Sequence, residues 1–212
     1  MKRPQAKSSS EELRSIFAPR RAAIRDRLRD FAKIPPGAYF YELAYCLLTP
    51  QSSAVNAEKV VRLLREDNFL HRGIDPEPHL NRKDCYIRFH KTKAKSLLMM
   101  REQFPEVAHQ LENGSSSAEL REWLVNNVRG IGWKESSHFL RNIGHRDLAI
   151  LDRHILKNLV RFRVMRGLPK TLTPKRYLSI EKRFRRFASE IGIPMDELDL
   201  LFWSSETGEI LK

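Results

Sequence analysis

The stretch Val128–Lys134 reads VRGIGWK, and helical apolar patterns precede and follow it over residues 118–128 and 133–143. Gly130 and Gly132 permit a tight turn with positive φ and leave no side chain between the backbone N–H groups and a ligand. The first N–H groups of the following helix point toward this turn, which makes it a site for an anion. The stretch therefore predicts two helices joined by a hairpin that binds a phosphate.

Length and charge define the broad class of protein. The chain has 212 residues, 41% of them apolar, which fits one large folded domain or two small ones. It carries 39 basic and 26 acidic residues, a formal net charge of +13, which draws a protein to polyanions. Nucleic acid is therefore the expected partner, and a solvated basic surface without a partner is the alternative. No signal peptide or long apolar run is present, so we expect a cytoplasmic location and no membrane partner.

The two cysteines and the helical patterning limit the classes of fold that the chain can adopt. Cys46 and Cys85 provide neither a disulfide framework nor the spacing of a zinc site. Period-two alternation is scarce, so we expect an all-α fold. Residues 1–10 are predicted to be a flexible start and residues 68–84 a connecting loop, and Thr173 is predicted to cap a helix. Helices are expected over residues 11–33 with an interruption at Pro19, 38–48, 53–66, 91–103, 105–112, 117–128, 133–143, 153–165, 174–190 and 194–204.

Residues 118–160 resemble the helix-hairpin-helix of the DNA glycosylase superfamily. The resemblance rests on the Gly130-x-Gly132 hairpin, on Lys134 two positions after the second glycine, and on Asp152, which opens another helix. The endonuclease III branch of that superfamily carries four cysteines for an iron–sulfur cluster, and a chain with two cysteines argues against that branch. No iron–sulfur cluster is therefore expected, and no cofactor is required.

The resemblance implies a two-lobed helical architecture with DNA bound in the cleft between the lobes. It divides the chain into an N-terminal segment, a central lobe and a C-terminal lobe. The segment of residues 1–36 is expected to pack with the C-terminal lobe of residues 141–212, and residues 37–140 form the central lobe that includes the start of the hairpin motif.

Lys134 and Asp152 are the candidate catalytic residues. A lysine amine can attack the sugar C1′ and form a Schiff base once the base departs, which permits β-elimination of the 3′ phosphate. The carboxylate of Asp152 can stabilise positive charge that develops on the sugar, because glycosidic cleavage passes through an oxocarbenium-like state. The plainer alternatives are a solvated surface lysine and a helix N-cap aspartate, and the second is compatible with catalysis because a cap fixes the carboxylate.

The hairpin and one further turn are expected to contact the DNA. The N–H groups of Gly130 and Gly132 are expected to hold a phosphate, and Arg129 to contact the backbone. Gln51, in the segment TPQSS between two apolar helices, resembles the superfamily residue that fills the gap left by a flipped base, since an amide can both donate and accept hydrogen bonds. A helix cap or turn residue is the alternative for Gln51.

Two further sets of residues have weaker predictions. The superfamily resemblance implies a monovalent cation, Na⁺ or K⁺, bound by the hairpin carbonyl groups of Asn126, Val128 and Ile131. Other basic residues could contact phosphates, although most are expected on solvated helix faces; among them are Lys91, Lys93, Lys95 and the run of residues 182–186.

The C-terminus resembles that of the archaeal-type 8-oxoguanine DNA glycosylases, which also occur in some bacteria. In that family an aromatic side chain near the end stacks on the flipped base and a terminal lysine folds back to the site; here these positions are Trp203 and Lys212. Phe89 is our candidate for the aromatic side chain on the other face of the base. The alternatives are core packing for Trp203 and a frayed end for Lys212.

The sequence therefore predicts a bifunctional glycosylase/AP lyase that excises 8-oxoguanine from duplex DNA, acting as a monomer in a prokaryotic cytoplasm close to the nucleoid. A glycosylase for another damaged base is the alternative within the same class. A helix-hairpin-helix module that binds DNA without catalysis is the alternative from another class, and such a module has no need of the Lys134–Asp152 pair.

Overall fold

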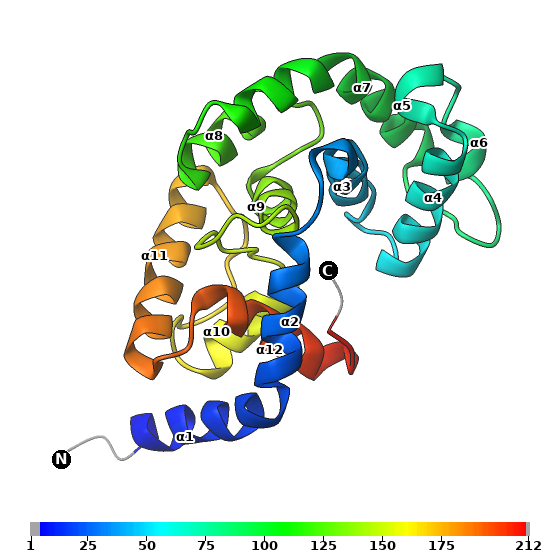
Figure 1. Cartoon of the computed structure of the whole chain (residues 1–212). Helices are drawn as coiled ribbons and strands as arrows, with labels where there is room; N and C mark the ends of the chain where they lie inside the picture. Colours follow the sequence, from blue (N-terminus) through cyan, green and yellow to red (C-terminus); the bar gives the residue numbers. More distant parts are fainter. Residues whose placement is uncertain (1–4, 211–212) are drawn as a thin grey trace. The chain divides into compact units, whose positions relative to one another are not determined.

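The computed structural model describes residues 5–210, and all regular structure in that range is helical, which confirms the predicted all-α class (Figure 1). Helices α8 and α9 flank the predicted hairpin, and α10 begins directly after Asp152. The elements are α1 (Gln5–Phe17), η1 (Ala18–Arg20), α2 (Arg21–Phe31), η2 (Pro36–Ala38), α3 (Tyr39–Leu48), α4 (Ala54–Glu66), α5 (Phe69–Arg72), α6 (Glu77–Leu80), α7 (His90–Glu112), α8 (Ser117–Asn127), α9 (Trp133–Asn142), α10 (Arg153–Arg161), α11 (Pro174–Ile191) and α12 (Met195–Thr207).

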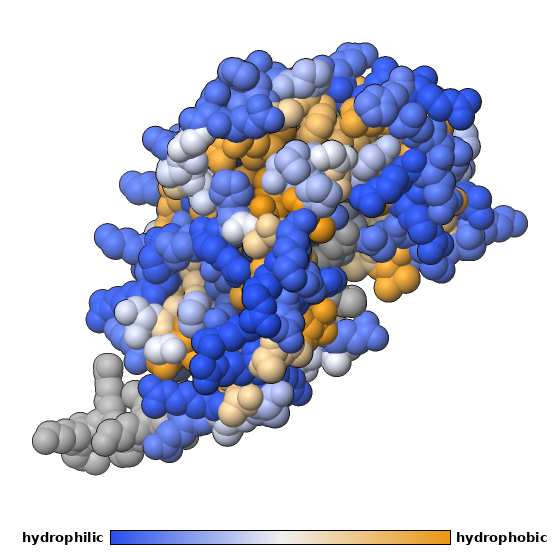
Figure 2. Space-filling view, viewed as in Figure 1, coloured by the Kyte–Doolittle hydropathy of each residue, from blue (hydrophilic) through white to orange (hydrophobic). Residues whose placement is uncertain are grey.

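The chain forms two compact units. Residues Ile34–Ile143 make up one of them, which we call the central unit. The chain before Ile34 and the chain after Ile143 together make up the other, which we call the terminal unit. Hydrophilic side chains cover most of the face that Figure 2 displays, as expected for a chain rich in lysine and arginine.

The central unit is built around α3. Every residue of this helix from Phe40 to Leu48 is buried, and the helix contacts α4, α7 and α9. Apart from Glu42, which accepts a hydrogen bond from Asn142, its side chains are largely apolar on all sides, so burying the whole helix removes the largest area of apolar surface from water. Phe40 packs edge-on against Phe104, with ring centroids 5.2 Å apart. This core carries the α8–α9 hairpin, because α9 packs on both α3 and α8.

The terminal unit is built around α12, which contacts α2, α10 and α11. Phe202 on α12 stacks on Phe162 and Phe184, with ring centroids 5.7 Å and 6.1 Å apart. An ion pair between Arg25 and Glu197, 3.0 Å long, joins α2 to the same helix. The N-terminal and C-terminal segments of the chain thus share one apolar core.

Three expectations about secondary structure were wrong. The break expected at Pro105 is absent, because α7 runs through it from His90 to Glu112. Met100 and Val107 are buried on this helix, and packing of that face outweighs the hydrogen bond that proline removes. The expected loop of residues 68–84 contains the short helices α5 and α6, and the expected flexible start is helical from Gln5 onward.

Candidate active site

The hairpin between α8 and α9 requires one of its two glycines for conformational reasons. Gly130 has φ of +86°, and a Cβ atom there would lie 3.3 Å from Ser96 Oγ. Gly132 instead has φ of −100° and ψ of −172°, an extended conformation open to any residue. The expectation of positive φ at both glycines was therefore wrong for Gly132, which is the N-cap residue of α9, and N-cap residues are normally extended.

A carboxylate that the sequence analysis missed organises the start of α9. The backbone N–H of Gly132 donates to Glu135 Oε2 at 3.3 Å, and Lys134 Nζ lies 3.2 Å from Glu135 Oε1. The side chain of Lys134 is only 26% exposed. The Glu135 carboxylate thus contacts both the backbone N–H of Gly132 and the amine of Lys134. A phosphate can bind this N–H only if it displaces the carboxylate. An acidic residue in the first turn of α9 was the signal available in the sequence.

Lys93 is buried close to this cluster, contrary to the expectation of a solvated or phosphate-facing side chain. It is 8% exposed, and its Nζ donates to Leu48 O and Pro50 O at 2.7 Å each and to Ser52 Oγ at 3.2 Å. Burial lowers the pKa of Lys93 to about 8, with a further lowering from the positive charge of Lys134. A buried ammonium group needs such partners because an unpaired charge in the interior is costly.

The bonds of Lys93 fix the turn that presents Gln51. Ser52 N donates to Thr49 O at 3.0 Å, which closes a four-residue turn with Pro50 at its second position. Gln51 occupies the third position with φ of +56°, a left-handed conformation that is rare outside glycine, and its side chain is exposed. The end of α3 and this turn are therefore tied to α7 by one ammonium group, and Gln51 is held in a strained conformation.

Phe89 is a second strained and exposed residue, joined to the first through Ser52. It has φ of +61°, is 50% exposed and directly precedes α7. The backbone N–H of Arg88 donates to Ser52 Oγ at 3.0 Å, and the Arg88 guanidinium lies over the Phe89 ring, 4.9 Å from its centroid. Left-handed backbone at a non-glycine residue is found where surrounding structure enforces it, often at binding sites. The hydroxyl of Ser52 thus links the turns of Gln51 and Phe89.

In the terminal unit, Asp152 caps α10. Its Oδ1 accepts hydrogen bonds from the backbone N–H groups of His154 and Ile155, each 2.8 Å long. Its Oδ2 has no hydrogen-bond donor among the residues that the structure describes. The N-cap alternative from the sequence is therefore correct, and it leaves one carboxylate oxygen, on a half-buried side chain, for another role.

Trp203 lies close to the residues that follow Asp152. Its ring and that of His154 are 6.3 Å apart between centroids, at 70°. His154 Nδ1 also lies 3.7 Å from Glu206 Oε2 on the same helix as Trp203. Trp203 is half-buried. Lys212 lies outside the described residues.

The remaining predicted contacts lie on the hairpin itself. Arg129 is exposed, and its Nη1 lies 3.6 Å from Met99 Sδ. Asn126 is exposed in the last turn of α8, whereas Val128 and Ile131 are buried. Val128 O accepts a hydrogen bond from Ile131 N at 3.3 Å, which closes the hairpin turn.

Residues 5–210 show neither a metal site nor a helix suited to span a membrane. Those residues contain no group of three or more histidine, cysteine or acidic side chains arranged to hold a metal ion. None of the described helices has the length and apolar character needed to span a bilayer. Cys46 and Cys85 are both buried free thiols, and burial raises the pKa of Cys46.

Comparison with known proteins identifies the family. The sequence profile of the family described as 8-oxoguanine DNA glycosylase matches residues 24–193. The chain belongs to this family. An 8-oxoguanine DNA glycosylase/AP lyase of Fusobacterium nucleatum is 40% identical over 213 residues, which cover 95% of this chain and 96% of that protein. Another, from Methanocaldococcus jannaschii, is 38% identical over 82% of this chain and 83% of its own length.

Solved structures of 8-oxoguanine glycosylases have the same fold. The Methanocaldococcus jannaschii glycosylase/lyase in complex with a 15mer DNA containing 8-oxoguanine matches with a TM-score of 0.84 and 33% identity, over 97% of this chain and 98% of that chain. The Thermotoga maritima 8-oxoguanine DNA glycosylase matches with a TM-score of 0.86 and 29% identity, over 98% and 100% of the two chains. The predicted helix-hairpin-helix glycosylase fold and the predicted family are confirmed.

Within this 8-oxoguanine glycosylase family member, each unit gathers its own part of the candidate site. The central unit joins the turns of Gln51 and Phe89 through Ser52 and Lys93, and the positive charge of Lys134 lowers the pKa of Lys93. The terminal unit gathers Asp152 and Trp203 around the first turn of α10.

Proposed function

We propose that this chain is a bifunctional 8-oxoguanine DNA glycosylase/AP lyase that acts on duplex DNA by flipping the damaged base. The observation that carries the proposal is the family match over residues 24–193, together with Lys134 in the first turn of α9, where its amine contacts Glu135. Relatives named 8-oxoguanine DNA glycosylase/AP lyase span nearly the whole chain. A module that only binds DNA has no need of the Lys134–Asp152 pair.

Lys134 is the nucleophile in this proposal. Its neutral amine attacks C1′ of the damaged nucleotide, a C1′–N bond to the lysine forms, and the bond from C1′ to the base breaks as the base leaves with a proton. Opening of the sugar ring gives the Schiff base, from which a C2′ proton and the 3′ phosphate are lost. Glu135, 3.2 Å from Nζ, is placed to take the proton that the ammonium must lose.

Asp152 stabilises the positive charge that develops on the sugar as the base departs. The proposal is supported by Oδ2, which remains available while Oδ1 binds the two N–H groups of α10. Because the cap fixes the side chain, the carboxylate is preorganised and needs little reorganisation during the reaction.

Four residues are proposed to handle the flipped base and the space it leaves. Gln51, on the tip of its turn, fills the gap in the duplex and pairs with the orphaned base. Phe89 and Trp203 stack on the two faces of the flipped 8-oxoguanine, and Lys212 contributes to its recognition. Exposure and left-handed backbone at Gln51 and Phe89 support this assignment, since strain of this kind is retained where binding requires it.

The hairpin is proposed to hold the DNA backbone. The N–H groups of Gly130 and Gly132 bind a phosphate, which displaces the Glu135 carboxylate from Gly132, and Arg129 contacts the backbone nearby. A monovalent cation, Na⁺ or K⁺, is proposed to bind the carbonyl groups of Asn126, Val128 and Ile131. The last carbonyl groups of a helix lack intrahelical partners, which supports a cation next to the end of α8.

The two units are proposed to be the two lobes that bind the DNA, with the N-terminal segment, residues 1–36, in the same lobe as residues 141–212. The contact between α2 and α12 supports this arrangement. The protein is proposed to act as a monomer in a prokaryotic cytoplasm close to the nucleoid, in line with its bacterial and archaeal relatives.

The test compares the wild-type protein with Lys134→Gln on a duplex that contains one 8-oxoguanine, with an otherwise identical guanine duplex as the control. The wild type is expected to release the base and nick the strand only at the lesion, whereas Lys134→Gln binds the same duplex nearly as tightly and does neither. Collapse of binding in Lys134→Gln would show an electrostatic or structural role instead. Equal excision of another damaged base would show a different substrate preference.

A further inference from the structure

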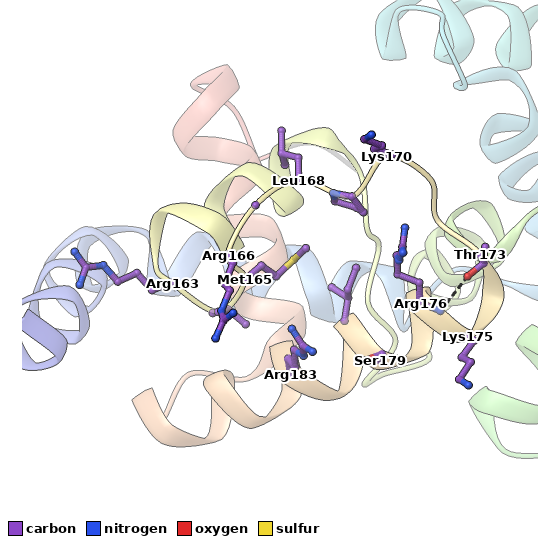
Figure 3. Close-up of a pocket in the computed structure, with 14 residues that line it drawn as sticks. Arg163, Met165, Arg166, Leu168, Lys170, Thr173, Lys175, Arg176, Ser179 and Arg183 are labelled. Carbon is purple, nitrogen blue, oxygen red and sulfur yellow. Dashed lines mark hydrogen bonds between the residues drawn. The ribbon is translucent and has the colours of Figure 1, made fainter.

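A second basic site lies in the terminal unit. A groove of about 1030 Å³ runs between the loop that joins α10 to α11 and the side of α11 (Figure 3). The buried side chains of Met165 and Ile180 form part of its lining. No acidic residue of the described chain lines it, and its six basic residues are Arg163, Arg166, Lys170, Lys175, Arg176 and Arg183.

The cations of this groove lack carboxylate partners within residues 5–210. Arg176 alone makes a hydrogen bond, from Nη1 to Thr171 O at 3.0 Å, and the other basic groove residues have no ion pair in that range. On the same helix, Arg186 pairs with Glu190 at 2.8 Å. Arg185, also outside the groove, pairs with Asp147 at 2.8 Å, whereas the groove cations of α11 have no such carboxylate partner in the described chain.

The groove has a defined structure, because hydrogen bonds fix both ends of the loop that forms one of its walls. The loop begins at Arg163, whose φ of +60° turns the chain away from α10, and Val164 N donates back to Leu159 O at 2.8 Å. It ends at Thr173, whose Oγ1 accepts a hydrogen bond from Arg176 N at 3.3 Å and caps α11. The basic side chains are therefore held on two defined walls, and Figure 3 shows Arg166 and Lys170 on the loop wall and Arg183 on the helix wall.

We propose that this groove binds the sugar–phosphate backbone of duplex DNA, as a contact additional to the Gly130–Gly132 hairpin. The proposal rests on the proposed function only in taking DNA as the polyanion that the protein meets. Arg176 and Arg183 share one face of α11 about 10 Å apart along its axis. That span corresponds to roughly three base-pair rises of ~3.4 Å, so the helix wall can follow successive phosphates.

The groove lies at the opposite end of α10 from the candidate catalytic residue Asp152. Asp152 caps the N-terminal end of this nine-residue helix, and the groove begins beyond its C-terminal end. The helix is about 13 Å long. The groove therefore contacts phosphates at a distance from the damaged nucleotide, and its contribution is affinity for the duplex, independent of the lesion.

The experiment measures binding of the full chain to a long undamaged duplex at a series of salt concentrations. The groove variant combines Arg166→Gln, Lys170→Gln and Arg183→Gln, which remove three exposed cations that make no hydrogen bond in the described chain. The slope of log K against log salt is expected to become shallower by about 2 to 3, since each phosphate contact contributes ~0.9.

A matched variant removes the same charge from elsewhere. It combines Lys33→Gln, Arg62→Gln and Arg186→Gln, three exposed cations that each face a carboxylate one helical turn away. This variant is expected to keep the slope within about 1 of the wild type. On a short duplex that ends close to the lesion, the two variants are expected to bind equally.

Equal slopes for the two variants on the long duplex would overturn the proposal. An unchanged slope for the groove variant, combined with lost binding of polyglutamate, would also overturn it and would indicate an acidic protein segment as the occupant. Because the long duplex is undamaged, the change in its salt slope is independent of whether the wild type excises 8-oxoguanine.

Discussion

Replacement of the buried Lys93 by methionine tests how the structure prepares Gln51 for its proposed role. Methionine keeps the length and apolar stem of the side chain but removes the ammonium group that binds Leu48 O, Pro50 O and Ser52 Oγ. The strained backbone of Gln51 is then held by the closing hydrogen bond from Ser52 N to Thr49 O and by the bond from Arg88 N to Ser52 Oγ alone.

The free energy that the turn loses can be worked out from these contacts. A hydrogen bond from a charged group contributes about 1.5–3 kcal/mol, and water can replace part of what the half-buried Pro50 carbonyl loses. We take the net loss as roughly 2 kcal/mol, and because ~1.4 kcal/mol is tenfold, the left-handed turn becomes about 30-fold less populated. Excision of 8-oxoguanine from duplex DNA is expected to slow by about 10- to 30-fold under single-turnover conditions.

The assay compares Lys93→Met with Lys91→Met and Lys95→Met, which remove the same charge from exposed positions of the same helix. Only the first is expected to lose excision. Combining it with Gln51→Ala is expected to add little further loss, because both changes remove the same function. On a single-stranded abasic substrate, which has no gap to fill, strand cleavage is expected to be nearly unchanged. An equal loss there would show that Lys93 acts on Lys134 and would refute the reasoning.

Four further predictions follow from the geometry. The pKa of Lys93 is about 8 in the folded chain and 10.5 in the unfolded chain, so the unfolded chain binds more protons between these two pH values. The free energy of unfolding, measured relative to Lys93→Met by urea titration, should therefore rise from pH 8 to pH 10.5. A difference that stays constant over this range would contradict the prediction. Gly130→Ala should lower the free energy of unfolding by more than about 1 kcal/mol, because φ is positive there, whereas Gly37→Ala, with open space around it, should not. Asp152→Asn should keep the cap and the melting temperature but slow excision by about 100-fold or more, and a matching loss of stability would reduce the residue to a cap. Deletion of Lys212 should weaken 8-oxoguanine excision far more than nicking at a preformed abasic site; equal losses would count against base recognition by the C-terminus.

The hairpin and the helix that follows Asp152 could be predicted because their signals are local. Two glycines one residue apart between helical patterns, and an aspartate directly before a helix, are each determined by backbone geometry that short sequences encode. The same reasoning was wrong about the φ of Gly132, because the residue before a helix adopts the extended conformation of a cap whatever its identity.

The buried role of Lys93 could not be read from its residue type. Lys91, Lys93 and Lys95 alternate as similar charges, yet only the middle one lies on the face of α7 that also carries Leu97 and Met100. That helical spacing was the available signal, but the partners that make burial possible are carbonyl groups more than forty residues away in the chain. Tertiary contacts of this kind leave no local pattern.

The left-handed backbone at Gln51 and Phe89 was likewise outside the reach of sequence patterns. Both residues were singled out by resemblance alone, and neither residue type favours positive φ. Their conformation depends on Ser52, which accepts from Arg88 N on one turn and from Lys93 on the other side. Only the folded central unit brings these groups together.

Borohydride trapping tests the central claim most directly. The protein is mixed with a duplex that carries one 8-oxoguanine, with a guanine duplex as the control, and the adduct is mapped by mass spectrometry. The account predicts a covalent adduct that forms only with the lesion, maps to Lys134 and is absent in Lys134→Gln. Tight binding of the damaged duplex without any adduct, or an adduct on a different lysine, would contradict it.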